Sequence, residues 1–324
     1  MNELMKLSEI HDSKNKKIKA LHVNIRSMRK NWEELMLIFE ETKIEWDIIV
    51  LTEINIKKYE TILYKLKNYE SCFLTRETTK RGGGICIFVK KEIEVVFTEV
   101  KIDINDGILA NLRIGHTEVT LLGIYRQPSS NKGKFITELK KLIENNQDVQ
   151  SNFVIIGDIN IDIMKTKTKN DVRWCDKYVN LMAKNGMEEL IDSPTRQEIV
   201  NGRLSESCID HIYTRGKELN SEAFVWQKKI SDHYFTLLTW EMTKGEEKNE
   251  SYSKTKLNDD NIIKELNEVD WRFLDRIDDV DLAYDEIRRI IQNIYKENTE
   301  MIRINNSGTV KKKNHGLLMR YLQK

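Results

Sequence analysis

Four short stretches of the chain place acids, amides or histidines beside runs of apolar residues. In the clearest one, residues 153–156 are Phe-Val-Ile-Ile, and Gly-Asp-Ile-Asn follows at residues 157–160. Consecutive apolar residues of mostly β-branched type are typical of a strand that is buried on both faces. We therefore expect Asp158 and Asn160 at the end of such a strand, on the rim of a hydrophobic core.

Three other stretches repeat this arrangement in distant parts of the chain. Their polar residues are Glu53 after the apolar run 46–51, Asp210 and His211 within 207–213, and Asp232 and His233 before 234–240. Strand ends from distant parts of a chain can meet at one edge of a sheet sandwich. Acids, an amide and a histidine gathered in this way form a site suited to metal-assisted hydrolysis.

Each stretch also has a simpler interpretation. Gly-Asp-x-Asn after a strand is more often a turn whose side chains bond their own backbone. Glu53 alone is most often a solvated strand end, and Asp210 beside His211 is compatible with a surface pair. Only the occurrence of all four stretches in one chain favours a shared site over four independent turns.

The composition limits the class of protein. The 324 residues are 40% hydrophobic, which is enough for a sizeable core, and 53 basic residues nearly balance 52 acidic ones. A global basic field is therefore excluded, so any contact with nucleic acid must come from a local patch. The sequence has no apolar run near the roughly 20 residues that span a bilayer and no signal peptide, so we expect an intracellular protein without membrane association.

The four cysteines show no metal-binding spacing. They lie at Cys72, Cys86, Cys175 and Cys208, without a C-x-x-C pair. Neither a zinc site nor a disulfide framework is indicated by this pattern. We therefore expect reduced thiols.

The first part of the chain predicts a strand, a helix and a second strand. Residues 18–25 alternate in hydropathy and carry Asn24 at their end. Asn31 is expected to cap a helix whose apolar face begins at Trp32. The apolar run before Glu53 completes a βαβ-like opening.

A β-rich middle follows, with two more helices. Residues 81–84, Arg-Gly-Gly-Gly, are interpreted as the flexible tip of a hairpin rather than a phosphate-binding loop, because the pattern G-x-x-x-x-G-K is missing. The other expected elements are strands at 72–74, 84–89, 95–97, 108–114 and 118–125, turns at 105–107 and 114–116, and helices at 134–144 and 174–182. Trp174 and Tyr178 are assigned to the core.

The pattern changes near residue 242. Strand-like runs stop there, and helical spacing begins at Ile262 and continues to Ile294. We therefore expect a polar segment at residues 1–17, a folded domain at 18–241, and a mostly helical appendage at 242–324.

The ordered set of motifs resembles the endonuclease/exonuclease/phosphatase superfamily, the group of pancreatic deoxyribonuclease and the apurinic/apyrimidinic endonucleases. It looks most like the endonuclease domain of LINE-type non-LTR retrotransposons. The resemblance covers about residues 18–241 and rests on Asn24 in Val-Asn-Ile-Arg-Ser, Glu53 in Leu-Thr-Glu, residues 81–84, Tyr125 in Tyr-Arg-Gln-Pro-Ser, Gly-Asp-Ile-Asn at 157–160, Pro-Thr-Arg at 194–196, Asp210 in Ile-Asp-His-Ile, and Ser-Asp-His at 231–233. The fold implied is α/β, a four-layer sandwich of two mixed β-sheets flanked by helices, with a helical C-terminal appendage.

The resemblance also implies a metal centre. Glu53 would be the main ligand of Mg²⁺, with Asn24 and Asp232 beside it, and Mn²⁺ is an alternative ion. All three offer hard oxygen ligands, which suit Mg²⁺ that keeps several waters and a substrate phosphate. One departure is Arg26, which stands where many members of the superfamily carry an acid.

Catalytic roles are implied for a further group of residues. His233 would bind the scissile phosphate, oriented by Asp210, and Asp158 would orient or deprotonate the attacking water. Asn160 and Tyr125 would donate hydrogen bonds to the phosphoryl oxygens. Two arginines are expected to contact phosphates, Arg126 and Arg196.

The function implied is nicking of double-stranded DNA, which leaves a 3′-hydroxyl and a 5′-phosphate. The substrate suggests action in the nucleus, and the parent element would supply RNA or a reverse transcriptase in trans. No Tyr-x-Asp-Asp polymerase motif is present, so a truncated copy is expected. The alternatives are an apurinic-site repair nuclease, a phosphatase of phosphoinositides or other small phosphate esters, and an inactive domesticated copy that only binds nucleic acid.

Overall fold

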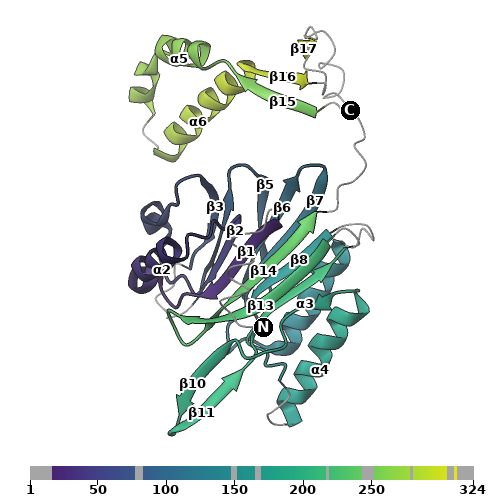
Figure 1. The fold of residues 1–324 in the computed structure, drawn as a ribbon. Helices are drawn as coiled ribbons and strands as arrows, with labels where there is room; N and C mark the ends of the chain where they lie inside the picture. Colours follow the sequence, from purple (N-terminus) through teal and green to yellow (C-terminus); the bar gives the residue numbers. More distant parts are fainter. Residues whose placement is uncertain are drawn as a thin grey trace. The chain divides into compact units, whose positions relative to one another are not determined.

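The computed structural model describes residues 17–76, 83–146, 152–164, 169–216, 219–242, 252–277, 280–304 and 310–311. The chain divides into two compact units, Met1–Thr243 and Lys244–Lys324. The first unit contains two six-stranded sheets with helices packed against them, as Figure 1 shows.

The first sheet carries the N-terminal strands and the last strands of the unit. Its members are β1 (Lys17–Asn24), β2 (Ile48–Thr52), β3 (Tyr69–Leu74), β4 (Ile85–Lys90), β13 (Leu219–Lys229) and β14 (Tyr234–Met242). They lie in the order β13-β14-β1-β2-β4-β3. Only the pair β1 and β2 is parallel among the described pairings of this sheet.

The second sheet carries the middle of the chain. Its members are β5 (Glu94–Ile102), β6 (Asn105–Ile114), β7 (Thr117–Tyr125), β8 (Asn152–Asp158), β9 (Glu188–Glu189) and β12 (Asp210–Arg215). They lie in the order β5-β6-β7-β8-β12-β9, with β7 and β8 parallel. Both sheets are therefore mixed, and the predicted sandwich fold is confirmed.

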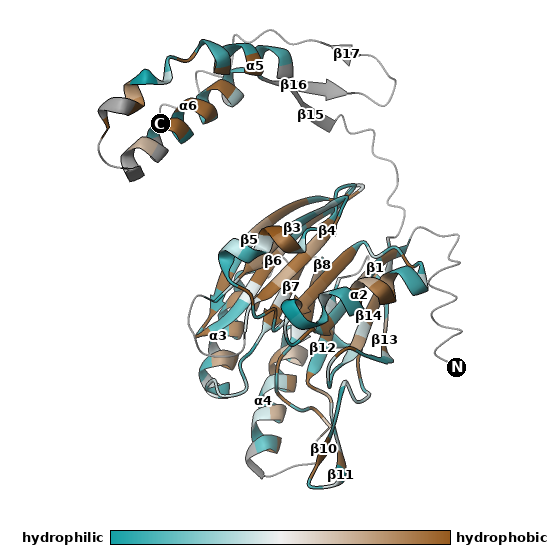
Figure 2. Ribbon diagram, turned by 90° about the vertical axis from the view of Figure 1, so that its left-hand side faces the viewer, coloured by the Kyte–Doolittle hydropathy of each residue, from teal (hydrophilic) through white to brown (hydrophobic). Residues whose placement is uncertain are grey.

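Three hydrophobic clusters hold the layers together. The first lies between the sheets and includes Ala20, Val154 and Trp240. The second packs the first sheet against the helix α2 (Met28–Thr42). The third packs the second sheet against α3 (Lys132–Asn145) and α4 (Lys169–Lys184). Figure 2 shows hydrophobic residues concentrated in the strands of both sheets.

The helix α2 begins earlier than expected. It starts after Ser27, and Asn31 lies inside it rather than at its N-cap. The Asn31 side chain is buried and donates from Nδ2 to the carbonyl of Ile25 at 2.8 Å. The sequence pattern therefore identified a side chain that hydrogen-bonds the backbone just before the helix, but it placed the start of the helix about one turn too late.

One expected turn differs from the structure, and an expected hairpin agrees with it. Residues 105–107 were expected to form a turn, but they open the strand β6, and Asp106 is only 1% exposed. The strands around the glycine-rich stretch, β3 and β4, form the expected antiparallel hairpin. Residues 81 and 82 of its tip lie outside the described residues.

Smaller elements complete the first unit. They are η1 (Lys58–Tyr64) and the two-stranded hairpin of β10 (Arg196–Val200) and β11 (Arg203–Ser207). Figure 1 shows this hairpin projecting from the sandwich. It leaves Ile199 and Leu204 77% and 62% exposed.

The second unit contains helices together with a small sheet. Its helices are α5 (Asp259–Glu268), η2 (Trp271–Arg276) and α6 (Val280–Glu297), and its strands are β15 (Tyr252–Leu257), β16 (Thr299–Ile304) and β17 (Val310–Lys311). The helices were expected, whereas the three-stranded sheet was not. Among the described residues, no helix has the length and apolar character needed to cross a bilayer.

Candidate active site

At one end of the space between the sheets, the inward-facing residues change from apolar to polar. In β1 the inner face carries Ile18 and Ala20 in the core cluster. Because strand side chains alternate with a period of two, His22 and Asn24 continue the same face. Both side chains are fully buried, so the rim of the core is built from polar groups.

A row of polar residues crosses the second sheet at the same level. Asp106 lies opposite Tyr125, Tyr125 lies opposite Asp158, and Asp158 lies opposite Asp210. Neighbouring strands are about 4.8 Å apart, so these four residues follow one another in consecutive steps of that size. The strand register therefore gathers three of the predicted site residues and adds Asp106.

Asn24 connects the two sheets. Its Nδ2 donates to Glu53 Oε1 at 2.9 Å and to Asp158 Oδ2 at 2.8 Å. The Tyr125 hydroxyl donates to the same Glu53 oxygen at 3.3 Å, and the Asn24 Oδ1 accepts from the Arg26 N–H at 3.0 Å. The structure thus brings Asn24, Glu53, Tyr125 and Asp158 into one hydrogen-bonded group.

His233 and Asp210 form a buried pair beside this group. His233 Nδ1 lies 2.8 Å from Asp210 Oδ2, and both residues are almost fully buried. Burial by itself lowers the pKa of His233, but the adjacent charge and hydrogen bond of Asp210 outweigh it and raise the pKa to about 9. His233 is therefore a cation at neutral pH.

The pKa of Asp158 is also raised, which for a carboxyl group favours the neutral form. Burial, together with the negative charge of Asp210, raises the pKa of Asp158 to about 8. A cation placed beside this carboxyl would favour its ionised form. The site therefore has an energetic reason to accept a positive ion.

Asp232 is held by two arginines. Its Oδ2 accepts from Arg26 Nη2 at 2.7 Å and from Arg196 Nε at 2.6 Å, while its Oδ1 is buried and has no hydrogen-bond partner among the described residues. Arg196 also donates to Glu198 at 2.7 Å. Asp232 thus offers one unused oxygen to the site.

One group of the described residues has the spacing of a metal site: ligand atoms of Asp158, Asp210 and His233 lie within 4.8 Å of one another. His233 and Asp210 already bond each other, however, so this group has few free ligand atoms. Ligation by the acidic residues Glu53 and Asp232, whose oxygens suit Mg²⁺, stays a prediction. Asn24 presents its Nδ2 to Glu53 here, so metal ligation through its amide oxygen stays a prediction.

Arg126 differs from the expectation of a phosphate contact. Its side chain is fully buried, and its guanidinium donates to the carbonyls of Asn160 at 3.1 Å and Ser130 at 2.6 Å. Asn160 returns a bond from Nδ2 to the Arg126 carbonyl at 2.8 Å. Because its donors face backbone inside the protein, Arg126 fixes the loop that carries Asn160 and does not reach a substrate.

Comparison with known proteins agrees with this geometry. The sequence profile of the Endonuclease/Exonuclease/phosphatase family matches residues 24–233. The chain belongs to the endonuclease/exonuclease/phosphatase family. Members of this family are hydrolytic nucleases and phosphatases that typically use a divalent metal, and the acidic site described above fits that pattern.

Solved structures of this family share the fold. The endonuclease domain of TRAS1, a telomere-specific non-LTR retrotransposon, is 16% identical and superposes with a TM-score of 0.53 over 70% of this chain and 100% of that one. Truncated TDP2 of Caenorhabditis elegans is 13% identical, with a TM-score of 0.52 over 69% and 98%. A mannosyl-6-phosphatase of Bacteroides thetaiotaomicron is also 13% identical, with a TM-score of 0.52 over 69% of this chain and 99% of that one. No curated protein matches the sequence.

Three residues near the site, Thr195, Ser231 and His22, had no role assigned to them from the sequence. The Thr195 Oγ1 accepts from the N–H groups of Ile209 and Asp210 at 3.1 and 3.0 Å, and so fixes the start of β12. The Ser231 hydroxyl donates to the Asn24 carbonyl at 2.7 Å. His22 Nδ1 lies 4.0 Å from Asp210 Oδ1. Its position two residues before Asn24 is the signal that would have placed it on the same face.

The backbone around the family site is strained at four non-glycine residues. Arg26, Glu53, Asn55 and Asn160 have φ angles of 53°, 51°, 50° and 51°. This left-handed conformation costs roughly 1–2 kcal/mol per residue and tends to occur at functional sites. The hydrogen bonds described above hold Arg26, Glu53 and Asn160 in place.

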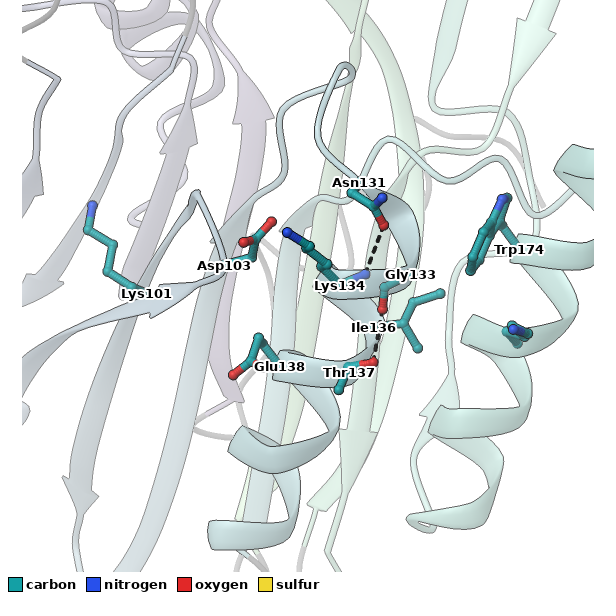
Figure 3. Close-up of a pocket in the computed structure, with 10 residues that line it drawn as sticks. Lys101, Asp103, Asn131, Gly133, Lys134, Ile136, Thr137, Glu138 and Trp174 are labelled. Carbon is teal, nitrogen blue, oxygen red and sulfur yellow. Dashed lines mark hydrogen bonds between the residues drawn. The ribbon is translucent and has the colours of Figure 1, made fainter.

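A groove lies away from these residues. It has a volume of about 760 Å³ and is lined by residues of β5, α3 and α4, as Figure 3 shows. Its charges are mixed, because Lys101, Lys134 and Lys177 line it together with Asp103 and Glu138. Trp174, expected in the core, lines this groove with its ring against Gly133 and below the Lys177 ammonium. None of the predicted site residues lines it.

The burial of His211 leads us to expect that the folded state loses stability in acid. Its ring is buried between the Tyr178 hydroxyl and the Cys208 carbonyl, and burial lowers its pKa from 6.5 to about 4. Between these pH values the unfolded chain binds a proton that the folded chain excludes. The free energy of unfolding should therefore fall by about 3 kcal/mol, through this residue, as the pH drops from 7 to 4. Denaturant unfolding of His211→Gln, which does not titrate, should show a flatter pH dependence, and an unchanged slope would contradict this.

Proposed function

We propose that this chain is a divalent-cation-dependent endonuclease that nicks double-stranded DNA. The observation that carries the proposal is the buried His233–Asp210 pair beside the Glu53, Asn24 and Asp158 group. In this proposal a cationic imidazole, a carboxylate for water and an acidic metal position would lie around one point. Together they would support phosphodiester hydrolysis.

Each residue has a definite part in this proposal. His233, positively charged at neutral pH, would neutralise a phosphoryl oxygen as charge develops there. Asp158, ionised when a cation is bound beside it, would hold the attacking water and take its proton. Burial raises the pKa of Tyr125, which keeps its hydroxyl protonated, so that it donates to an oxygen of the substrate together with Asn160.

A bound cation would add charge stabilisation to these groups. Glu53 and the free Oδ1 of Asp232 would hold it, and it would polarise a phosphoryl oxygen. The product would carry a 3′-hydroxyl and a 5′-phosphate. In a retrotransposon such a nick would prime reverse transcription in the nucleus, with RNA and polymerase from the same element.

Two observations support DNA over a small phosphate ester. The likeness to the TRAS1 endonuclease domain is consistent with it, although the likeness to a mannosyl-6-phosphatase shows that the fold also serves phosphatases. The more specific observation is the projecting hairpin of β10 and β11, which leaves the apolar side chains of Ile199 and Leu204 exposed. Apolar side chains in such a position can enter a groove of DNA and favour steps that unstack easily.

The proposal is tested by plasmid nicking. The full chain would be incubated with supercoiled plasmid in Mg²⁺, in Mn²⁺ and in EDTA, beside an abasic duplex and inositol phosphates. Metal-dependent conversion of the plasmid to open circles is the expected result. Preference for the abasic duplex would indicate a repair nuclease, and release of inorganic phosphate from inositol phosphates would indicate a phosphatase. Metal-independent DNA binding without turnover on any substrate would indicate an inactive copy.

A further inference from the structure

The 3₁₀ helix η1 leaves three large apolar side chains in contact with solvent. Tyr59, Ile62 and Leu63 are 73%, 66% and 70% exposed, whereas Tyr64 at the end of the element is buried. Residues three apart lie on one face of a 3₁₀ helix, so Tyr59 and Ile62 form a row and Leu63 borders it. Single exposed apolar residues are normal on a protein surface, but a group of this kind is typical of an interaction site.

Exposed lysines lie on both sides of this apolar group in the chain. They are Lys57, Lys58, Lys65 and Lys67. The only acid between them is Glu60, and its carboxylate accepts from Arg29 Nε at 2.6 Å. The surface of η1 is therefore apolar with a basic rim.

Two contacts place η1 beside α2. The rings of Trp32 and Tyr64 meet edge to face, with their centroids 5.5 Å apart. The ion pair of Arg29 and Glu60 also joins the two elements. The exposed sides of α2 and η1 thus belong to one surface of the first unit.

The solvent side of α2 is acidic. Leu37 is 58% exposed, and its four neighbours on the helix surface, three and four residues before and after it, are all exposed glutamates. They are Glu33, Glu34, Glu40 and Glu41. Glu41 lies 3.5 Å from Lys228 Nζ of the same copy, which leaves three carboxylates around Leu37 for another partner.

We propose that two copies of this chain form a two-fold symmetric dimer, in which η1 of each copy packs against α2 of the other. Leu37 of one copy then meets the apolar group of η1 in the other, and the glutamates around it meet the lysines. A two-fold interface contains every contact twice, so adjacent basic and acidic surfaces of one chain complement each other in it. Both halves of this match lie in the same chain, which favours a second copy over a partner of another sequence.

The size of this surface predicts a weak dimer. The 15 residues of α2 extend over about 22 Å, and with η1 beside it at a spacing of about 10 Å the two elements present on the order of 400 Å². A stable complex buries about 800 Å² per partner. We therefore expect a dissociation constant of roughly 10–100 μM.

Sedimentation equilibrium of the full chain tests the dimer. The protein would be purified free of nucleic acid and measured from about 1 to about 300 μM, in about 0.05 M and about 0.5 M NaCl. We expect a monomer–dimer equilibrium whose dissociation constant rises at least about tenfold at the higher salt, because salt screens the exposed charges. A protein that stays monomeric at the highest concentration in low salt would overturn the inference.

Exchanging the charges identifies the two surfaces. Lys58→Glu with Lys65→Glu makes η1 acidic, and Glu33→Lys with Glu40→Lys makes α2 basic. Each pair of substitutions brings like charges together, so each variant alone should dimerise at least about tenfold more weakly. An equimolar mixture of the two variants should form heterodimers, and the chain with all four substitutions should dimerise again. Because all four side chains are exposed, the fold should be kept. Dimerisation that the substitutions do not weaken, or that their combination does not restore, would show that α2 and η1 do not contact each other across the interface.

Ile62→Ser measures the apolar part of the contact. It removes an apolar side chain from the centre of the proposed interface and should raise the dissociation constant about tenfold. Val96→Ser is the matched control, because Val96 is also 66% exposed but lies on β5 in the second sheet, and it should leave the dissociation constant within about twofold. Equal effects of the two substitutions would contradict the inference. A loss of binding to a short DNA duplex in Ile62→Ser, with self-association unchanged, would assign this surface to nucleic acid instead.

Discussion

Replacing His233 with alanine is expected to lower the rate of DNA nicking by at least about a hundredfold. The substitution removes the positive charge that the buried Asp210 maintains at neutral pH, at the point where the phosphoryl oxygens gain negative charge. Losing one preorganised group of this kind typically costs a factor of 10²–10³ in rate. The measurement is the initial rate of open-circle formation at saturating Mg²⁺.

Two further variants locate the cause of this loss. Asp210→Asn keeps the shape of the pair but removes its charge, and we expect a loss of 10- to 100-fold, as for other groups that orient a catalytic histidine. His116 is exposed beside the turn between β6 and β7, so His116→Ala is the control and should keep full activity. A His233→Ala protein that folds normally and nicks within about threefold of wild type would remove His233 from the mechanism.

Replacing Gly157 with alanine is expected to destabilise the fold by more than about 4 kcal/mol. Gly157 has a φ of +150° in the parallel pairing with β7, and an added Cβ would lie 2.0 Å from the carbonyl oxygen of Ile124. No flexible side chain can move aside, since the clash is with the backbone of the neighbouring central strand. Losses of this size are exceptional for single substitutions and follow from strain of this kind.

The measurement is thermal or denaturant unfolding of the purified variant. Gly115→Ala is the matched control, because Gly115 has a φ of +63° and an added Cβ there meets nothing within 4 Å. That variant should lose only about 1–2 kcal/mol, the cost of the left-handed conformation itself. Similar losses in the two variants would show that the close approach of the backbones around Gly157 does not decide stability.

The strands and the polar residues at their ends were predictable from local patterns. Unbroken apolar runs such as residues 153–156 occur because both faces of β8 are covered, and Asp158 marks the point where this cover ends. The pairing of His233 with Asp210 was implied by resemblance, and the structure shows them bonded. The partners that hold these residues come from distant segments, so spacing along the chain does not identify them.

Asp106 and Arg126 show why the rest was not predictable. Asn-Asp-Gly at residues 105–107 has the composition of a turn, but pairing with β7 continues the strand through it. Arg126 has the residue type of a phosphate contact, yet its Nη1 and Nη2 donate to carbonyls inside the protein. In both cases, tertiary contacts override the preference of the residue type.

The left-handed backbone at Arg26 has a consequence for laboratory evolution. Glycine adopts this conformation without penalty, so Arg26→Gly would relieve roughly 1 kcal/mol of strain while deleting the guanidinium held by Asp232. The same substitution leaves Arg196 as the remaining arginine partner of Asp232, so the relieved strain and the lost ion pair change stability in opposite directions. Selection for heat resistance would therefore favour glycine here only if the relieved strain exceeds the stabilisation from that ion pair.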